Sequence, residues 1–277
     1  MAGRRLLVGE RPIGIYDSGV GGLTVWSALR TLTDRPLVYY GDTAHVPYGG
    51  RHPEEIIAFS TRIVGFLVER DCAAVVAACN TSSALALPQM RRPERVPVIG
   101  VIESAVEEAI AVTTCGRVGL LATENTAKSG VYQDMLVGQA PGLVLSAVSC
   151  PDFVPLVEAG QTTGPAVVEA VKRYMHSLNG AGVDTVILGC THYPFLAPVI
   201  KDLYPHIRFV DPAFSTARRV LELIGRGSAM GSQRRVMHDE FWVSGSPEKF
   251  QTRAQLLLGT SIALVRQDQT VRAYRAL

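Results

Sequence analysis

The sequence predicts an α/β fold with two similar domains, each built on a mostly parallel central sheet. Short apolar runs rich in β-branched residues recur between longer stretches that are compatible with helices, which is typical of a parallel sheet covered on both faces. These runs come in two series of four, which indicates two related domains. The chain has 277 residues, 47% hydrophobic and 19% charged, which is enough for two cores of this kind.

The elements follow in order along the chain. The first series of predicted strands lies at 12–16, 37–40, 74–78 and 96–101, and the second at 117–122, 143–148, 184–188 and 207–210. One helix, Pro53–Glu69, is marked by a proline and an acidic first turn. The tail adds two weaker strand candidates, 240–243 and 261–265. We therefore expect residues 1–102 plus 211–277 to form an N-terminal domain completed by the tail, and residues 103–210 to form the second domain.

Composition and charge exclude several classes of protein. A formal net charge of +2 gives no field that favours nucleic acid or a membrane surface, and no apolar run approaches the roughly 20 residues of a spanning helix. The cysteines are odd in number and scattered, with no Cys-x-x-Cys pair, so a disulfide scaffold and a four-cysteine zinc site do not fit. A reducing, cytoplasmic compartment is expected. The five are Cys72, Cys79, Cys115, Cys150 and Cys190.

Small polar clusters follow five of the predicted strands. Ligands of open parallel sheets bind outside the carboxyl ends of the strands, so two domains that face each other would bring these clusters to one interdomain cleft. Taken singly, each cluster has an alternative role as the N-cap of the next helix. Their convergence nevertheless predicts an active site in the cleft. The clusters are Asp17-Ser18, Asp42-Thr43, Cys79-Asn80-Thr81, Thr123 and Cys190-Thr191-His192.

Cys79 and Cys190 occupy matching places in the two series. A single cysteine after an apolar strand is usually a small core residue, but each of these is followed by two hydrogen-bonding side chains. A thiolate can take a proton from one face of a carbon while a thiol returns one to the other face, without a cofactor. The sulfurs would then lie about 7 Å apart across the substrate, since each must reach the reacting carbon from its own side. That separation is too long for a disulfide.

Two other kinds of site are disfavoured. Gly19, Gly21 and Gly22 follow a strand, but their spacing is not Gly-x-Gly-x-x-Gly and no P-loop lysine follows, so a tight turn into a helix is preferred over a phosphate cradle. Cys190 and His192 could be metal ligands, but no further ligands cluster near them in the sequence. We therefore predict neither a metal nor a cofactor.

Several segments, in order along nearly the whole chain, resemble the glutamate racemases. Two of them carry the cysteines, as Ala78-Cys79-Asn80-Thr81 and Leu188-Gly189-Cys190-Thr191-His192-Tyr193-Pro194. Any one segment would be suggestive, and all of them in order are highly specific. The others are 13–25, 41–43, 46–49, 150–151, 153–158 and 243–248.

The resemblance implies two pseudosymmetric α/β domains, L- and D-glutamate as substrates, no pyridoxal phosphate, and supply of D-glutamate for peptidoglycan. A homodimer is compatible with it. It implies that Cys79 is the base for the D enantiomer and Cys190 the base for the L enantiomer. Asp17 and His192 would assist the thiols and the substrate ammonium, with Asp42 and Glu158 as auxiliary carboxylates. The remaining implied substrate-binding residues are Ser18, Tyr48, Gly49, Asn80, Thr81, Thr123, Thr126 and Thr191.

Three other functions stay open from the residues. Another acidic amino acid, notably aspartate, could be racemised by the same thiols, although a side chain one methylene shorter would leave the donors of Ser18 and Tyr48 unmet. A binding or regulatory protein on this fold would have no reason to retain both cysteines. A thiol redox enzyme lacks the expected Cys-x-x-Cys.

Overall fold

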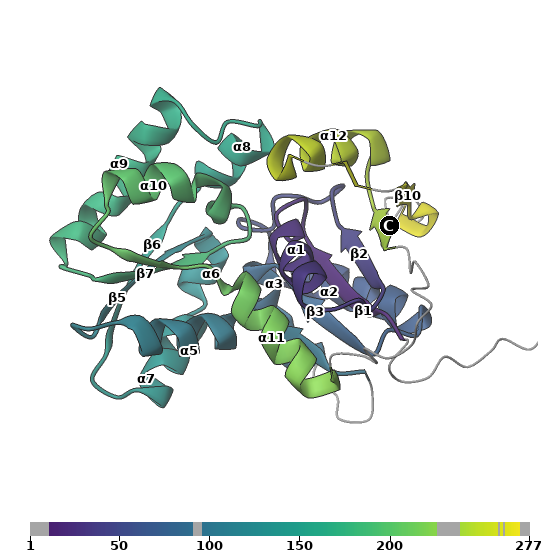
Figure 1. Cartoon of the computed structure of the whole chain (residues 1–277), viewed down its shortest axis with the longest axis horizontal. Helices are drawn as coiled ribbons and strands as arrows, with labels where there is room; N and C mark the ends of the chain where they lie inside the picture. The colour runs from purple at the N-terminus through teal and green to yellow at the C-terminus, as the bar shows by residue number, and fades with distance from the viewer. Residues whose placement is uncertain (1–10, 91–95, 226–238, 260, 263, 272–277) are drawn as a thin grey trace, which may run out of the picture.

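The computed structural model describes residues 11–90, 96–225, 239–259, 261–262 and 264–271. Its strands form two separate sheets, and every strand pairing within them is parallel. The six-stranded sheet has the order β10-β9-β2-β1-β3-β4, and the four-stranded sheet has the order β6-β5-β7-β8. Figure 1 shows the two sheets next to each other, each covered by helices. The predicted α/β class with parallel sheets is confirmed.

The six-stranded sheet and its helices are called the first unit. Its strands are β1 (Ile13–Asp17), β2 (Leu37–Gly41), β3 (Ala74–Ala77), β4 (Val98–Gly100), β9 (Glu240–Val243) and β10 (Val265–Gln267). Its helices are α1 (Leu23–Leu32), α2 (Pro53–Glu69), α3 (Asn80–Leu85), α4 (Leu87–Met90), α11 (Pro212–Ile224) and α12 (Pro247–Leu258).

The four-stranded sheet and its helices are called the second unit. Its strands are β5 (Arg117–Ala122), β6 (Val144–Ser149), β7 (Thr185–Gly189) and β8 (Arg208–Val210). Its helices are α5 (Ile102–Val112), α6 (Glu124–Lys128), α7 (Val131–Gln139), α8 (Phe153–Glu158), α9 (Pro165–Gly180), the short 3₁₀ helix η1 (Tyr193–Leu196) and α10 (Ala197–Leu203).

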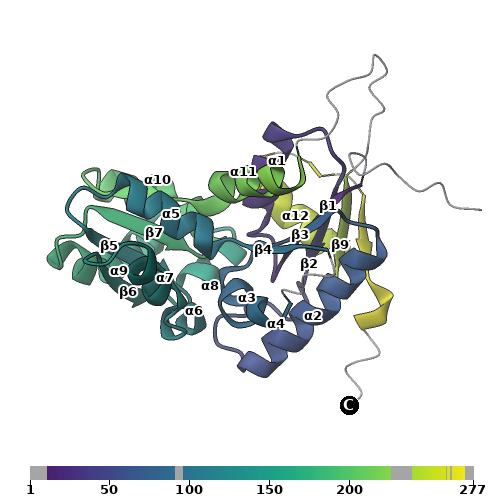
Figure 2. The same cartoon turned by 90° about the horizontal axis from the view of Figure 1, so that it is seen from below.

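Both faces of the first sheet are buried, which explains why its strands read as continuous apolar runs. Ile13 and Ile15 of β1 belong to a core shared with α1 and α11, whereas Tyr16 belongs to a core shared with Ile63 and Leu67 of α2. Figure 2 shows α2 on one face of this sheet and α1 and α11 on the other. Side chains alternate between the two faces of the sheet along β1, so the face to which its last residue, Asp17, points is fixed.

The second sheet is covered in the same way. Val186 and Leu188 of β7 pack in a core with α9, and Ile187 packs on the opposite face in a core with α5 and α7. The central strands of the two sheets, β1 and β7, are fully buried. A buried strand therefore leads into each of the clusters at 17–18 and 190–192.

Most sequence expectations hold, with shifts of one or two residues at strand ends. Pro53–Glu69 is a helix with the expected bounds, with Pro53 in its first turn followed by Glu54 and Glu55. Strands at 117–122 and 240–243 also match their predicted bounds. The strand predicted at 96–101 spans only Val98–Gly100.

The last predicted strand, 261–265, was wrong. The strand β10 begins at Val265, where pairing with Phe241 of β9 starts, and continues to Gln267. Helix α12 ends before Gly259, so the chain must first return to the sheet, and Leu264 on this path is 70% exposed. The hydrophobic residues at the start of this predicted strand therefore do not indicate pairing with a neighbouring strand. Residue 263 lies outside the described residues.

The chain passes between the units twice. It leaves the first unit after β4, where α5 begins at Ile102, and returns after β8, where α11 begins at Pro212. The expected boundaries near 102 and 211 fall at these helix starts, and the division into domains stays a prediction. None of the helices in the described residues is both long enough and apolar enough to cross a membrane.

Candidate active site

The polar clusters lie where the strands end. Asp17 is the last residue of β1, Cys79 follows β3 and begins α3, Thr123 follows β5 and begins α6, and Cys190 follows β7. Because the strands of each sheet are parallel, their carboxyl ends share one edge of that sheet. The structure places these edges against each other.

One cavity of about 280 Å³, partly open to solvent, lies between the two edges. Hydrogen-bonding side chains make up most of its lining, which suits a small polar ligand. Both thiols line it, one from each unit. Its lining consists of Ser18, Pro47, Tyr48, Gly49, Cys79, Asn80, Thr81, Thr123, Val154, Cys190, Thr191 and His192.

The other predicted site residues stand one step behind this lining. Asp17 and Asp42 accept hydrogen bonds from Thr191 and Tyr48, respectively. Thr126 contacts the hydroxyls of Thr81 and Thr123, and Glu158 contacts His192. The structure thus brings every predicted residue to the site, in two layers.

Cys190 lies against a polarised imidazole. Its Sγ is 3.8 Å from His192 Nδ1, and His192 Nε2 is 2.8 Å from Glu158 Oε1. Burial by itself lowers the pKa of His192, but its hydrogen bonds to Cys190 and Glu158 outweigh this and raise the pKa to about 10. An imidazolium fits this position, with its positive charge between the Glu158 carboxylate and the Cys190 sulfur.

Cys79 has the opposite environment. Burial, reinforced by the negative charge of Asp17, raises the pKa of Cys79 to about 12, so this group is a thiol at neutral pH. The described contact of its Sγ with an oxygen is a weak one, 3.9 Å from Ser18 Oγ. The two sulfurs therefore differ in the charged group near them, which is His192 for Cys190 and Asp17 for Cys79.

Asp17 connects the two units beside the thiols. Its carboxylate accepts a hydrogen bond from the Gly19 amide at 3.0 Å and from Thr191 Oγ1 of the second unit at 3.1 Å. Burial raises the pKa of Asp17 above its usual value, against the lowering effect of the charge on His192. A carboxylate that is poorly solvated in this way is stabilised by a nearby positive charge, which His192 provides.

Asp42 fixes the hydroxyl of Tyr48. Tyr48 Oη donates to Asp42 Oδ2 at 2.5 Å, and His45 Nδ1 lies 2.9 Å from Asp42 Oδ1. Burial raises the pKa of Asp42, but hydrogen bonds from His45, Ser244 and Tyr48 together with the charge of His45 lower it overall. Asp42 is therefore a carboxylate, and Tyr48 lines the cavity in a fixed position.

Hydroxyl and amide groups after Cys79 form hydrogen bonds across the interface between the units. Thr81 Oγ1 lies 3.0 Å from Thr123 Oγ1 and 3.2 Å from Thr126 Oγ1. Tyr132 donates to Asn80 Oδ1 at 2.6 Å, whereas the buried Asn80 Nδ2 makes no hydrogen bond with the described residues. Because Asn80 lines the cavity, this donor is available to an anionic group of a ligand.

The capping alternative does not account for these residues. Cys79 and Thr123 occupy the N-cap positions of α3 and α6, but neither side chain caps its helix. The glycines after β1 form a turn into α1, which begins at Leu23. Gly21 is packed against the second unit, which agrees with the turn preferred from the sequence.

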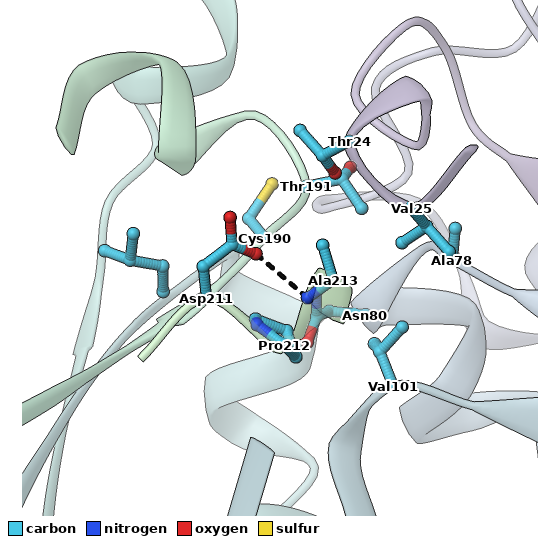
Figure 3. Close-up of a pocket in the computed structure, with 11 residues that line it drawn as sticks. Thr24, Val25, Ala78, Asn80, Val101, Cys190, Thr191, Asp211, Pro212 and Ala213 are labelled. Carbon is cyan, nitrogen blue, oxygen red and sulfur yellow. Dashed lines mark hydrogen bonds between the residues drawn. The ribbon is translucent and has the colours of Figure 1, made fainter. Parts of the chain in front are cut away.

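A second cavity, of about 200 Å³, lies behind Cys190 at the place where the chain returns to the first unit. Figure 3 shows Cys190 next to Asp211, whose carboxylate accepts the hydrogen bond of the Ala213 amide, and Thr191 beside Thr24. Asn80, Cys190 and Thr191 line both cavities, so the loop that carries the second thiol lies between them.

Some residues near the site were not expected from the sequence. Pro47 and Val154 line the cavity, and Arg253 of α12 lies 2.7 Å from Glu158 Oε2. Pro47 and Val154 lie within segments that resemble the racemases, so that signal was present, but nothing local marks Arg253. Among the described residues, no three His, Cys, Asp or Glu side chains gather closely enough to hold a metal ion.

Comparison with known proteins identifies the family. The family model for Asp/Glu/Hydantoin racemases matches residues 25–220. The chain belongs to this family. The glutamate racemase of Desulforudis audaxviator is 41% identical over 269 residues, which cover 92% of this chain and 98% of that protein. The expected resemblance to glutamate racemases and the expectation of a racemase are thereby confirmed.

Solved structures agree with this assignment. The glutamate racemase isoform RacE1 of Bacillus anthracis superposes with a TM-score of 0.85 at 33% identity, over 94% of this chain and 97% of that one. The glutamate racemase of Francisella tularensis, solved in complex with D-glutamate, gives a TM-score of 0.84 at 28% identity, with the same coverage of 94% and 97%. The racemase fold of this chain is therefore shared over nearly its whole length.

Proposed function

We propose that this racemase interconverts L- and D-glutamate without a cofactor, with Cys79 and Cys190 as its two proton-transferring groups. The observation that carries the proposal is that both thiols line one small cavity, one from each unit, with His192 beside only one of them. The identity of 41% to a glutamate racemase supports glutamate as the substrate. Supply of D-glutamate for peptidoglycan is part of the same proposal.

In the direction from L- to D-glutamate, Cys190 is the base and Cys79 is the acid. The Cys190 thiolate takes the Cα proton, and the electron pair of the broken C–H bond remains on the substrate, spread into its carboxylate. The Cys79 thiol gives its proton to the opposite face, which yields D-glutamate and a Cys79 thiolate. Turnover of D-glutamate, or proton exchange with solvent, restores the starting state.

The surrounding residues are proposed to bind different groups of the substrate. Asp17 and His192 lie where a substrate ammonium and the thiols need partners, and Asn80, Thr81 and Thr191 offer donors to a carboxylate. Ser18 and the Gly49 backbone are proposed to hold the side-chain carboxylate, and Tyr48, whose hydroxyl donates to Asp42, forms the wall beside it. Thr123 and Thr126 add hydroxyls, and Asp42 and Glu158 act through Tyr48 and His192. Buried donors without partners discriminate strongly against a ligand that fails to reach them, which disfavours aspartate.

Chiral chromatography of L-glutamate, incubated in heavy water with protein dialysed against a metal chelator, tests the proposal. We expect D-glutamate to accumulate until the enantiomers are equal, with solvent deuterium at Cα of the product. Absence of D-glutamate, or activity that requires added pyridoxal phosphate, would overturn it. Equal or faster turnover of aspartate would leave the two thiols in place and overturn the substrate.

A further inference from the structure

Helix α12 of the first unit reaches across to α8 of the second, beside the active site (Figure 1). Arg253 Nη1 of α12 lies 2.7 Å from Glu158 Oε2 at the end of α8. Leu257 of α12 packs against the hydrophobic cores of both units. The helix therefore makes a mixed polar and apolar contact across the interface, directly behind His192.

Arg253 is the charge partner of a buried carboxylate. The Glu158 side chain is 13% exposed, and its Oε1 faces His192 at 2.8 Å. Its Oε2 is buried and accepts no hydrogen bond from the described residues, so the guanidinium of Arg253 compensates this oxygen. Burial raises the pKa of Glu158, but the hydrogen bond and charge of His192 and the charge of Arg253 lower it overall.

Arg253, Glu158 and His192 form a row of alternating charge that runs from the surface to the sulfur of Cys190. Arg253 contacts Glu158, Glu158 contacts His192, and His192 lies 3.8 Å from Cys190 Sγ. Among the described residues, no such row of charges ends at Cys79, whose sulfur has Ser18 and Ser82 as hydrogen-bonding neighbours. A change at Arg253 is thus transmitted to one half of a two-thiol site.

We propose that Arg253 is a positioning residue for the Cys190 half of the site, which holds Glu158 against His192 only when α12 is docked on α8. This inference rests on the proposed function. Docking of the two units then positions His192 beside Cys190, the base for the L enantiomer. It does not change the positions of the groups around Cys79. Arg253 acts through Glu158 and touches no reacting atom.

A second ion pair across the interface provides the matched control. Arg219 of α11 lies 2.6 Å from Glu103 Oε1 and 3.0 Å from Glu107 Oε1 of α5. The Arg219 side chain is 35% exposed and that of Arg253 is 38% exposed, so both are similarly accessible links between the units. Arg219 lines neither of the two cavities described above.

The test measures each thiol separately, with a 3-chloro analogue of glutamate. A base removes the Cα proton, the C–Cl electron pair leaves as chloride, and the resulting enamine adds water to release ammonia and a 2-oxo acid. The L form requires Cys190 and the D form requires Cys79. Racemisation cannot make this distinction, because its equilibrium constant is one and kcat/KM must fall equally in both directions.

We expect Arg253→Met and Arg253→Gln to slow elimination from the L analogue roughly 10-fold, less than the loss of a positioned acid or base itself would cause. Elimination from the D analogue should be unchanged, and Arg253→Lys should restore most of the L rate. Arg219→Met should not separate the two enantiomers. Two charge-free variants are used so that one with a native circular dichroism spectrum is available.

The outcomes separate the inference from the proposed function. Equal losses for both enantiomers, the same selectivity in Arg219→Met, or no rescue by lysine would overturn the inference while wild-type racemisation still supports the function. A wild-type protein that neither racemises glutamate nor eliminates chloride would overturn both.

Discussion

Gly21 and Thr191 are in such close contact across the interface between the units that a Cβ on Gly21 would lie 2.3 Å from Thr191 Oγ1. The same Cβ would lie 2.7 Å from His192 Nδ1. Gly21 is not in the left-handed backbone region, so its requirement for glycine comes from this approach. A glycine of the first unit therefore sets how closely the second thiol loop can come.

Gly21→Ala should accordingly lower kcat/KM for L-glutamate about 100-fold, because displacing a catalytic group by about an ångström has an effect of this size. Steady-state kinetics measure the loss. Gly65→Ala is the control, since a Cβ at Gly65 meets nothing within 4 Å, and its activity should be unchanged. Wild-type kinetics in Gly21→Ala would show that the approach is not needed for catalysis.

Replacing either thiol separates the two half-reactions. Cys79→Ser and Cys190→Ser should each abolish measurable racemisation, because a serine hydroxyl is a poor base at neutral pH. Cys79→Ser should still eliminate chloride from the L analogue through Cys190, and Cys190→Ser from the D analogue through Cys79. Ammonia release gives the rates. Elimination from one and the same enantiomer by both variants would contradict the opposed arrangement of the thiols.

Asp17→Asn should lower kcat roughly 10²–10³-fold, within the range for a positioned acid or base partner. The amide keeps the size of the side chain and can still accept from Thr191, so the fold should be retained. Turnover and thermal melting are measured together. Near-normal turnover in a folded variant would reduce Asp17 to a structural link between Gly19 and Thr191.

The raised pKa of His192 predicts a pH-dependent contribution to stability. The folded pKa of about 10 lies above the unfolded value of 6.5, so the stabilisation is complete below pH 6.5 and is lost as the pH rises through 10. The difference in free energy of unfolding between wild type and His192→Gln should therefore shrink from pH 6 to pH 10. Urea unfolding at several pH values measures it. A difference that is constant over this window would mean that His192 is neutral.

Much of the fold follows from local signals in the sequence. The strand at 117–122 and the helix Pro53–Glu69 were predicted with their observed bounds, because buried apolar runs and a proline with acidic neighbours act locally. The strand at 261–265 failed because apolar residues there follow the end of α12 and lead back to the sheet. Hydrophobicity alone does not distinguish such a connection from a paired strand.

The inner layer of the site was predictable, and the outer layer only in part. Cys79 and Cys190 each follow a buried strand, so topology alone brings them to the sheet edges. Asp42 was marked by its place after a predicted strand, whereas Glu158 was found only by resemblance to the racemases. Arg253 meets Glu158 only through the packing of α12 on α8, and a contact between residues 158 and 253 leaves no periodic trace in the sequence.

The order of strands in the first sheet has a consequence for synthesis of the chain. Strand β2 pairs with β9, so that Val38 lies opposite Glu240, and the whole second sheet is encoded between them. As the chain leaves the ribosome, β5 to β8 can pair while β2 still presents an open edge. Open strand edges are templates for association with other chains, and long-range pairings form slowly. The nascent protein is thus most exposed to aggregation just before β9 emerges.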